Sequence, residues 1–186
     1  MTGELIRIVD AAMAEAVRRS GAWLACRPGC FECCLGAFPI TPSDAERLRE
    51  GLAALAAADP ERAARVEERA RESAIRLCHE FPGDPLAVLA KDDAEDNEPC
   101  PALDPETGTC DLYEARPVTC RTFGPAVSCG GEALGVCELC YQGASDEEIA
   151  ACRVELDLEA MEEAGGETIV ALALSGSIPA RSLAST

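Results

Sequence analysis

Four cysteines lie within nine residues near the start of the chain, namely Cys26, Cys30, Cys33 and Cys34. Pro28 and Gly29 break any helix between the first two, so the backbone can curl and direct several sulfurs toward one point. Thiols at this density suit a soft metal ion better than a hydrophobic core. The loop is therefore expected to supply half of the thiolates of a metal site.

A second cysteine-rich region, from Cys100 to Cys140, is expected to supply the rest. Turn-forming residues 104–108 predict a small hairpin with Cys100 and Cys110 near its ends. Pro117 suits the first position of a helical turn that presents Cys120. Farther on, Cys137 and Cys140 form a C-x-x-C, the spacing of a metal-binding turn or a redox dithiol. The strand and βαβ unit of a thioredoxin-like fold are not predicted around it.

Two arginines, Arg116 and Arg121, flank the predicted turn at Cys120. Their guanidinium groups could donate hydrogen bonds to sulfurs or pair with acidic neighbours, offsetting negative charge at the site. We therefore include both as cofactor-binding candidates, the alternative being ordinary surface arginines.

The elements that must position these residues are mostly helical. Apolar periodicity predicts a helix over 3–20. Thr41 and Pro42 begin a second helix that runs to about 58, with Ser43 and Glu46 as a competing capping box. Asp59 and Pro60 begin a third, which ends near Cys78, and a capping box at Ser145 opens another that runs to Gly165. Residues 167–175 suit a short helix or a strand, and the tail from 177 is expected to fray.

These elements predict a mainly α fold, with about five helices around an irregular, metal-stapled, cysteine-rich loop layer and one small β-hairpin. A chain of 186 residues fits a single domain over 1–186. Within it, the metal-binding core is expected over about 22–143 and a C-terminal packing helix over about 145–164.

Composition restricts the partners and the compartment. The net charge of −18 argues against nucleic acid and anionic membrane surfaces as partners. Residues 1–24 contain no secretory signal pattern and no apolar run is long enough to span a membrane, so we expect a cytoplasmic protein. Close cysteines in the reducing cytoplasm more often indicate metal or redox chemistry than structural disulfides. A protein or small-molecule partner, and the oligomeric state, are left open.

Other reactive groups give weaker signals. His79 is the only histidine and follows Cys78, but neighbours on a helix point about 100° apart, so a catalytic pair is disfavoured against a buried cysteine beside a surface histidine. The acidic residues 91–99 lack calcium-loop spacing and are expected to form a mobile loop. Gly130 and Gly131 lack the strand and helix of a nucleotide-binding loop.

Two motifs carry a family resemblance: the cluster at Cys26–Cys34 followed by the Thr41-capped helix, and the string Cys110-x-x-Tyr113-Glu114-x-Arg116-Pro117-x-x-Cys120-Arg121 with Cys100 upstream. Over about residues 22–143 the chain resembles the YkgJ-type cysteine-cluster family, CxxCxxCC, of zinc- or iron-chelating domains, some of which are iron–sulfur proteins. The resemblance implies metal ligation by Cys26, Cys30, Cys33, Cys34, Cys100, Cys110 and Cys120, and matches Cys137 to a later family cysteine. The chain departs from the family in having three residues, rather than two, between Cys26 and Cys30.

The metal and its role stay open between alternatives. Eight thiolates could form two tetrahedral zinc sites, with Cys33 and Cys34 serving different ones. Crowded spacing, proline and the resemblance favour an iron–sulfur cluster slightly over zinc. Cys140 or Cys129 could replace one of the eight ligands. The function is expected to be redox or metal handling, which leaves open an iron–sulfur oxidoreductase activity, or else a structural zinc that stabilises an interaction module without catalysis.

Three rival classes are disfavoured. Cys26, Cys30 and Cys33 have the spacing of radical-SAM enzymes, but Glu32 stands where that family has an aromatic residue, and no barrel is predicted. A copper-storage bundle would place cysteines along continuous helices, which Pro28 and Gly29 interrupt. A secreted, disulfide-stapled protein would need an export signal.

Overall fold

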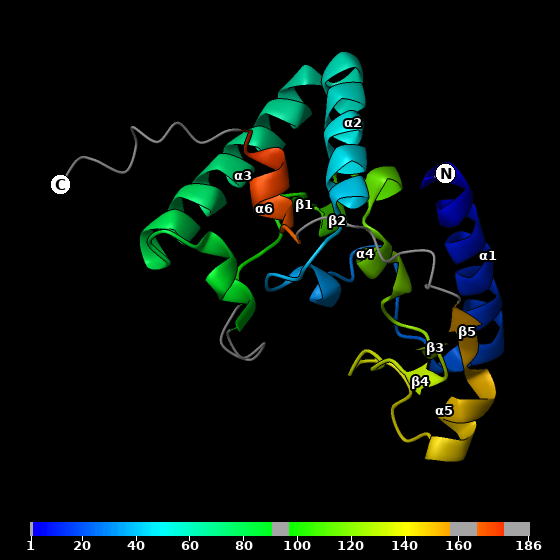
Figure 1. Cartoon of the computed structure of the whole chain (residues 1–186). Helices are drawn as coiled ribbons and strands as arrows, with labels where there is room; N and C mark the ends of the chain where they lie inside the picture. The colour runs from blue at the N-terminus through cyan, green and yellow to red at the C-terminus, as the bar shows by residue number, and fades with distance from the viewer. Residues whose placement is uncertain (1, 91–96, 157–166, 177–186) are drawn as a thin grey trace. The chain divides into compact units, whose positions relative to one another are not determined.

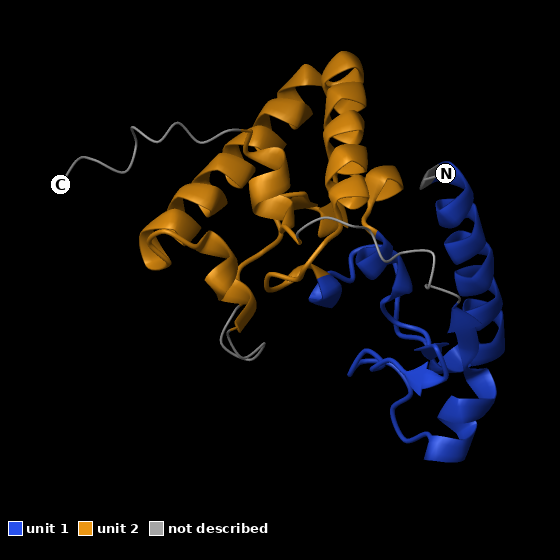
Figure 2. Ribbon diagram, viewed as in Figure 1, with its two compact units in different colours: residues 1–33, 118–164 blue, residues 34–117, 165–186 orange. Residues whose placement is uncertain are grey.

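Two separate stretches of sequence make up each of the two units into which the chain divides (Figures 1 and 2). The structure, a computed structural model, describes residues 2–90, 97–156 and 167–176. Unit 1 consists of residues 1–33 and 118–164, and unit 2 of residues 34–117 and 165–186. The boundary falls between Cys33 and Cys34, so the first cysteine cluster contributes to both units. The single domain predicted over 1–186 stays a prediction, since two such units can belong to one domain.

Unit 1 is organised by helix α1 (Thr2–Ser20), which confirms the helix predicted over 3–20. Its buried residues Val9, Met13 and Ala16 form a core with α4 (Val118–Thr122) and strand β5 (Val154–Leu156). Fully burying one such aliphatic side chain contributes about 1.5–3 kcal/mol. This core therefore packs the N-terminal helix against α4 and β5, which lie more than 90 residues later in the sequence.

A three-stranded sheet, which the sequence did not predict, lies in unit 1. Its strand order is β4 (Glu132–Ala133), β3 (Val127–Cys129) and β5, with β3 antiparallel to β4 and parallel to β5. Val127 lies opposite Val154, and Cys129 lies opposite Leu156. Parallel pairing requires a crossover between the strands, and here helix α5 (Asp146–Cys152) lies between them in the chain.

The packing helix predicted over about 145–164 ends at Cys152, so the prediction is wrong at residues 153–156. Its start is confirmed, because the Ser145 hydroxyl accepts a hydrogen bond from Glu148 N and the Glu148 carboxylate accepts one from Ser145 N. The chain then turns extended at Arg153 and forms β5. Val154 and Leu156 are buried while Glu155 between them is exposed, so a period of two and the pairing with β3 override the helical pattern. Residues 157–166 lie outside the described residues.

Unit 2 contains the helical pair α2 (Pro42–Ala58) and α3 (Pro60–Glu80), against which α6 (Val170–Leu174) packs. Thr41 caps α2 through a reciprocal capping box with Asp44, and Asp59 caps α3. Both helix starts were predicted, and the box uses Thr41 rather than the competing Ser43. The core between these helices buries, among others, Leu48, Leu52, Val66, Val170 and Leu174.

The loops of unit 2 are joined by short backbone pairings. Strands β1 (Leu103–Asp104) and β2 (Thr109–Cys110) form the predicted hairpin, with Leu103 opposite Cys110. Isolated bridges join Leu35 to Pro99 and Ile40 to Thr168. A short helix or a strand was predicted at 167–175. This segment contains the bridge at Thr168 and, after it, the short helix α6. Short 3-10 helices complete the described chain: η1 (Gly21–Trp23), η2 (Glu32–Cys34), η3 (Pro85–Ala90) and η4 (Tyr113–Ala115).

The predicted mainly α class with a small hairpin is confirmed. Cys78 is half-buried and His79 is exposed at the end of α3. No helix in the part of the chain that the structure describes is long and apolar enough to cross a membrane. The tail predicted to fray from 177 and most of the predicted acidic loop, at 91–96, lie outside the described residues.

Candidate metal centre

The first cysteine loop of unit 1 contains a hydrogen-bonded turn. Cys30 N donates to Arg27 O at 2.9 Å, and Gly29 within this turn has a φ of +87°, which few residues other than glycine adopt. Cys26 precedes the turn and is exposed, whereas Cys30 and Cys33 are half-buried. The Pro-Gly pair therefore acts as the sequence predicted, because it reverses the chain between Cys26 and Cys30.

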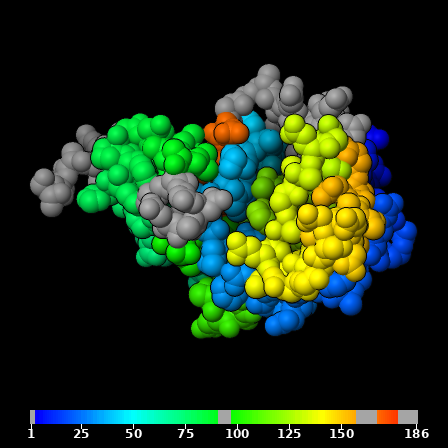
Figure 3. Space-filling view, turned by 90° about the horizontal axis from the view of Figure 1, so that it is seen from below, coloured from blue at the N-terminus to red at the C-terminus, as the bar shows by residue number. Residues whose placement is uncertain are grey.

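The C-x-x-C segment of unit 1 forms a second turn of the same kind. Cys140 N donates to Cys137 O at 2.9 Å, and Cys140 itself is buried. The next residue, Tyr141, has a positive φ of 56°, and its backbone N donates to Trp23 O at 2.8 Å. This bond joins the C-x-x-C segment to the chain just before Cys26. In Figure 3 the segment around it (yellow) forms part of the visible surface of unit 1.

The two turns bring one sulfur of each together, since Cys26 Sγ and Cys140 Sγ lie 3.9 Å apart. Partial burial of the sulfur and the nearby thiols of Cys140, Cys137 and Cys30, which disfavour a second negative charge, together raise the pKa of the Cys26 thiol to about 12. The four cysteines of the two turns are therefore close enough for their charges to interact.

Backbone N–H groups face the sulfur of Cys137. Burial raises the pKa of this thiol, whereas backbone hydrogen bonds from Leu139 and Cys140 lower it, and the Cys140 thiol raises it again. Backbone N–H donors stabilise a thiolate, so the turn favours the charged form that a metal ion requires. Repulsion between neighbouring thiolates opposes that form until a cation is present.

Unit 2 contains a second pair of neighbouring thiols, Cys100 and Cys110, and the backbone of Cys34 is joined to that of Cys100. Cys100 N donates to Cys34 O at 2.7 Å, and Leu103 N donates to Cys100 O at 2.9 Å, so Cys100 also begins a turn. Burial raises the pKa of the Cys100 thiol to about 12. Backbone hydrogen bonds from Ala102 and Leu103 lower the pKa, as does the nearby Arg69, while the Cys110 thiol raises it.

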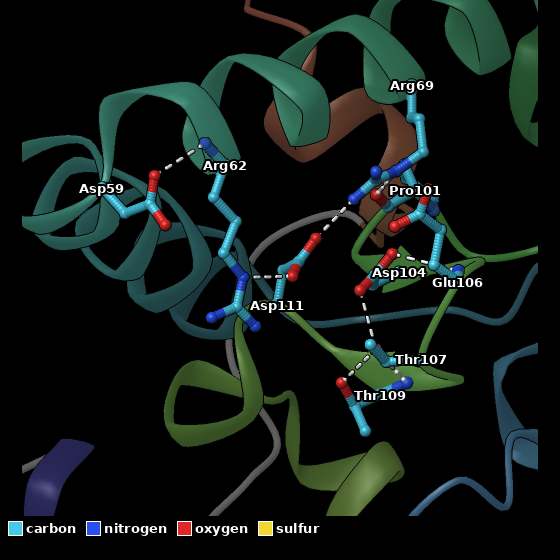
Figure 4. A network of polar contacts seen from close by, with 9 residues as sticks. All are labelled: Asp59, Arg62, Arg69, Pro101, Asp104, Glu106, Thr107, Thr109 and Asp111. Atoms are coloured by element: carbon cyan, nitrogen blue, oxygen red, sulfur yellow. Dashed lines mark hydrogen bonds and ion pairs between the residues drawn. The ribbon is translucent and has the colours of Figure 1, made fainter.

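An ion-pair network around one buried carboxylate attaches this hairpin to helix α3 (Figure 4). The Asp111 carboxylate, with a side chain only 2% exposed, accepts from Arg62 Nε at 2.5 Å and from Arg69 Nη2 at 2.6 Å. Arg69 Nε also donates to Pro101 O at 2.9 Å. Asp111 and Pro101 are the residues that follow Cys110 and Cys100, so one guanidinium binds the chain beside both cysteines.

The two arginines predicted to bind a cofactor have contacts of other kinds. Arg116 lies over the Tyr113 ring, with Cζ 3.5 Å from the ring centroid, and its Nε donates to Tyr113 O. Arg121 forms an ion pair with Asp10 of helix α1, with Nη1 and Oδ1 2.8 Å apart. The roles of both arginines as cofactor-binding residues stay predictions.

The remaining cysteines are distributed between helices and strands. Cys120 lies in α4, Cys129 in β3 and Cys78 in α3, all of them half-buried. Cys152 is buried in unit 1, where its Sγ lies 3.4 Å from Arg19 O, which confirms the prediction that it belongs to the core. All twelve cysteines lie in the described residues, and no disulfide joins any two of them.

No group of three or more His, Cys, Asp or Glu side chains within the described residues is arranged so that it could already hold a metal ion. The sulfurs of Cys26 and Cys140 lie 3.9 Å apart, and a site with three or more ligands would need further side chains to rotate toward them.

The comparison with known families decides the identity of the chain. Residues 25–140 match the family model CxxCxxCC, described as "Putative zinc- or iron-chelating domain". The chain belongs to the CxxCxxCC family. No curated protein and no solved structure matches it. The CxxCxxCC match confirms the resemblance drawn from the two cysteine motifs, and it begins one residue before Cys26 and ends at Cys140.

Cys140 is one of the four cysteines of this CxxCxxCC protein that are not among the eight predicted ligands. Its spacing from Cys137 was the available signal, and the sequence left open whether Cys140 replaces another ligand. The structure brings Cys140 next to Cys26, which is 114 residues away in the chain. The three-residue spacing between Cys26 and Cys30, which departs from the family pattern, therefore does not separate Cys26 from the other thiols of unit 1.

Proposed function

We propose that this CxxCxxCC protein binds metal through two groups of cysteine thiolates, one within each unit. The group in unit 1 consists of Cys26, Cys30, Cys137 and Cys140. The group in unit 2 consists of Cys34, Cys100 and Cys110. Cys33 and Cys120, which the sequence also predicts as ligands, stay predictions without an assigned group.

The observation that supports this proposal best is the spacing of Cys26 and Cys140. Since a zinc–sulfur bond is about 2.3 Å long, two sulfurs on one tetrahedral ion lie about 3.8 Å apart. The Cys26 and Cys140 sulfurs are 3.9 Å apart, which fits two ligands of a single ion. In a [4Fe–4S] cluster each cysteine binds a different iron, so the two sulfurs would have to separate. The spacing therefore favours zinc or a single iron at this pair over the cluster that the sequence slightly favours.

The local backbone supports the other two ligands of unit 1. Cys30 and Cys137 are half-buried on hydrogen-bonded turns, and both thiols already influence the charge of Cys26. Rotation of these two side chains would complete four thiolates, which is the usual set of a structural zinc site. A bound cation would supply the positive charge that offsets the repulsion between them.

The two groups differ in the number of coordination positions that they leave free on a tetrahedral ion. Four thiolates close a tetrahedral site, which suits a structural ion that stabilises unit 1. Three thiolates in unit 2 leave a fourth position on a tetrahedral ion, which suits metal handling or exchange. We assign no reaction to either site. The expected cytoplasmic location belongs to this proposal, because thiolate ligands must stay reduced.

The experiment is anaerobic purification followed by metal analysis and an absorption spectrum, with the wild-type chain and three variants. Cys26→Ser with Cys140→Ser removes half of the unit 1 group, and Cys100→Ser with Cys110→Ser removes most of the unit 2 group. Cys78→Ser is the control, since Cys78 belongs to neither group. We expect each double variant to lose metal and the control to retain the wild-type content.

The outcomes separate the candidates. A colourless protein that contains zinc, or a protein with thiolate-bound iron and no acid-labile sulfide, supports single-ion sites. Iron with acid-labile sulfide would support the iron–sulfur cluster and would contradict the single-ion proposal. Metal content that is the same in both double variants and in the wild type would contradict both groups.

A further inference from the structure

We infer that Arg69 is a positioning residue for the cysteine group of unit 2, where it orients Cys100 and Cys110 as a pair through Pro101 and Asp111. This inference rests on the proposed function, because it assumes that both cysteines bind metal. Arg69 lies on helix α3, outside both cysteine motifs, so neither motif indicates this role.

The geometry of one guanidinium carries the argument. Arg69 Nε donates to Pro101 O at 2.9 Å, while Arg69 Nη2 donates to Asp111 Oδ2 at 2.6 Å. Pro101 and Asp111 are direct neighbours of Cys100 and Cys110 in the chain. A planar guanidinium offers donors in a fixed arrangement, so it sets the separation of its two acceptors. The two cysteine-bearing segments are thereby oriented by one rigid group.

Asp111 is the second half of the arrangement. Its carboxylate is buried, with a side chain 2% exposed, and its other oxygen accepts from Arg62 Nε at 2.5 Å. Its backbone N donates to Ala102 O at 2.7 Å, which joins the two segments of the hairpin directly. A buried carboxylate requires such partners, so Asp111 has little freedom to move the cysteine that precedes it.

The charge of Arg69 adds a second effect in the same direction. Arg62, Arg69 and Asp111 together carry one net positive charge beside the cysteine group of unit 2. This charge would partly offset the negative charge of the ligand thiolates. Residues of this kind, which orient metal ligands without touching the ion, commonly affect metal affinity about 10- to 100-fold.

The test uses Co²⁺ and Zn²⁺ titrations of the full chain that carries Cys26→Ser and Cys140→Ser, so that the unit 2 group dominates the thiolate absorption. Arg69→Met removes both donors, and Arg69→Lys keeps the charge but loses the two-point contact. Arg71→Met is the matched control, since Arg71 lies on the same helix and pairs with the exposed Glu68. Circular dichroism and unfolding of the metal-free proteins check that each variant folds.

We expect Arg69→Met to weaken metal binding at least tenfold, Arg69→Lys to weaken it nearly as much, and the control to bind like its parent. A role of Arg69 in stability alone would change the unfolding midpoint but leave the affinity unchanged, and this result would overturn the inference. Full rescue by lysine would also overturn it, since charge alone would then suffice. Absence of thiolate absorption in the parent and in the wild type would overturn the proposed function together with this inference.

Discussion

The Cys26 sulfur lies 2.7 Å from the point that a Cβ on Gly124 would occupy. No Cβ can stand that close to a sulfur atom, so the backbone at Gly124 leaves space for Cys26 that any side chain would fill. Gly124 has a φ of +106°, which independently favours glycine. The position of Cys26, opposite Cys140, therefore depends on a residue 98 positions farther along the chain.

Gly124→Ala is expected to displace the Cys26 side chain and to weaken metal binding by unit 1 about 10- to 100-fold. Gly131→Ala is the matched control: its φ is +81°, so the backbone strain is similar, but no atom lies within 4 Å of the added Cβ. Both variants are expected to lose about 1–3 kcal/mol of unfolding free energy. Zinc competition titrations and chemical unfolding measure the two effects. Equal metal affinities in the two variants would contradict the role of Gly124.

Tyr141→Phe is expected to destabilise unit 1 by about 1–3 kcal/mol, since it leaves a buried donor without an acceptor. The Tyr141 hydroxyl accepts from Ala126 N at 2.8 Å, and it donates to Ser20 Oγ at 2.5 Å because that hydroxyl donates to Ala16 O. The variant is also expected to weaken metal binding, since Tyr141 directly follows Cys140. Urea unfolding and zinc titration measure both losses.

Tyr113→Phe is the control for that substitution, because Tyr113 is 55% exposed. Its unfolding free energy is expected to stay within about 0.5 kcal/mol of the wild type. If the two variants lost the same amount, the buried hydroxyl of Tyr141 would not be the cause.

The metal-free protein is expected to lose stability in alkaline solution. Burial raises the pKa of the Cys100 thiol from 9.0 to about 12, and partial burial together with the neighbouring thiols raises that of Cys26 to about 12 as well. A group whose pKa is raised by folding contributes stability that is fully present below the unfolded pKa and is lost as the pH rises through the folded one. The loss should therefore fall between pH 9 and about 12.

Thiolate absorbance measures this directly. Cys26→Ser and Cys100→Ser should each remove one thiol from the most alkaline part of the titration. Bound zinc should shift thiolate formation to much lower pH, because the ion binds only the deprotonated form. A titration in which the Cys26 and Cys100 thiols of the metal-free protein ionise near pH 9 would contradict their raised pKa values.

Thr41→Ala is expected to reduce the unfolding free energy by about 1 kcal/mol, because it removes the side-chain oxygen that accepts from Asp44 N at 3.1 Å. Thr41→Ser keeps that oxygen and should be nearly neutral. Thermal unfolding of the two variants tests the capping box, and equal losses would show that the hydroxyl of Thr41 does not cap α2.

Local signals were sufficient for the parts of the fold that depend on neighbours in sequence. Thr41 with Pro42, Asp59 with Pro60, and Ser145 with Glu148 begin helices where the sequence predicts them, because a cap acts within one turn. The turn residues 104–108 likewise predict the hairpin. These features place Cys100 and Cys110, yet they say nothing about what surrounds the two sulfurs.

Contacts between distant residues are what the sequence could not reveal. The pairing of Val127 with Val154 ends the predicted helix early, and no local pattern at Val154 specifies that partner. Arg69 reads as one more charged residue of a solvent-facing helix, because its partner Asp111 is 42 residues away. The sequence offers no reason to prefer Cys140 over the other cysteines as a ligand, and its distance to Cys26 supplies that reason.

Each unit combines residues from two separate stretches of the sequence, which limits how this chain can be truncated. The segment from 25 to 140, taken alone, would lack α1, α5, β5 and α6. Val118 and Val127 would lose the apolar surface of Val9 and Met13, and Leu48 would lose that of Val170. Excision at the limits of the matched segment would thus remove part of the apolar core that supports the cysteine turns, and a shortened version of this chain should keep its flanking helices.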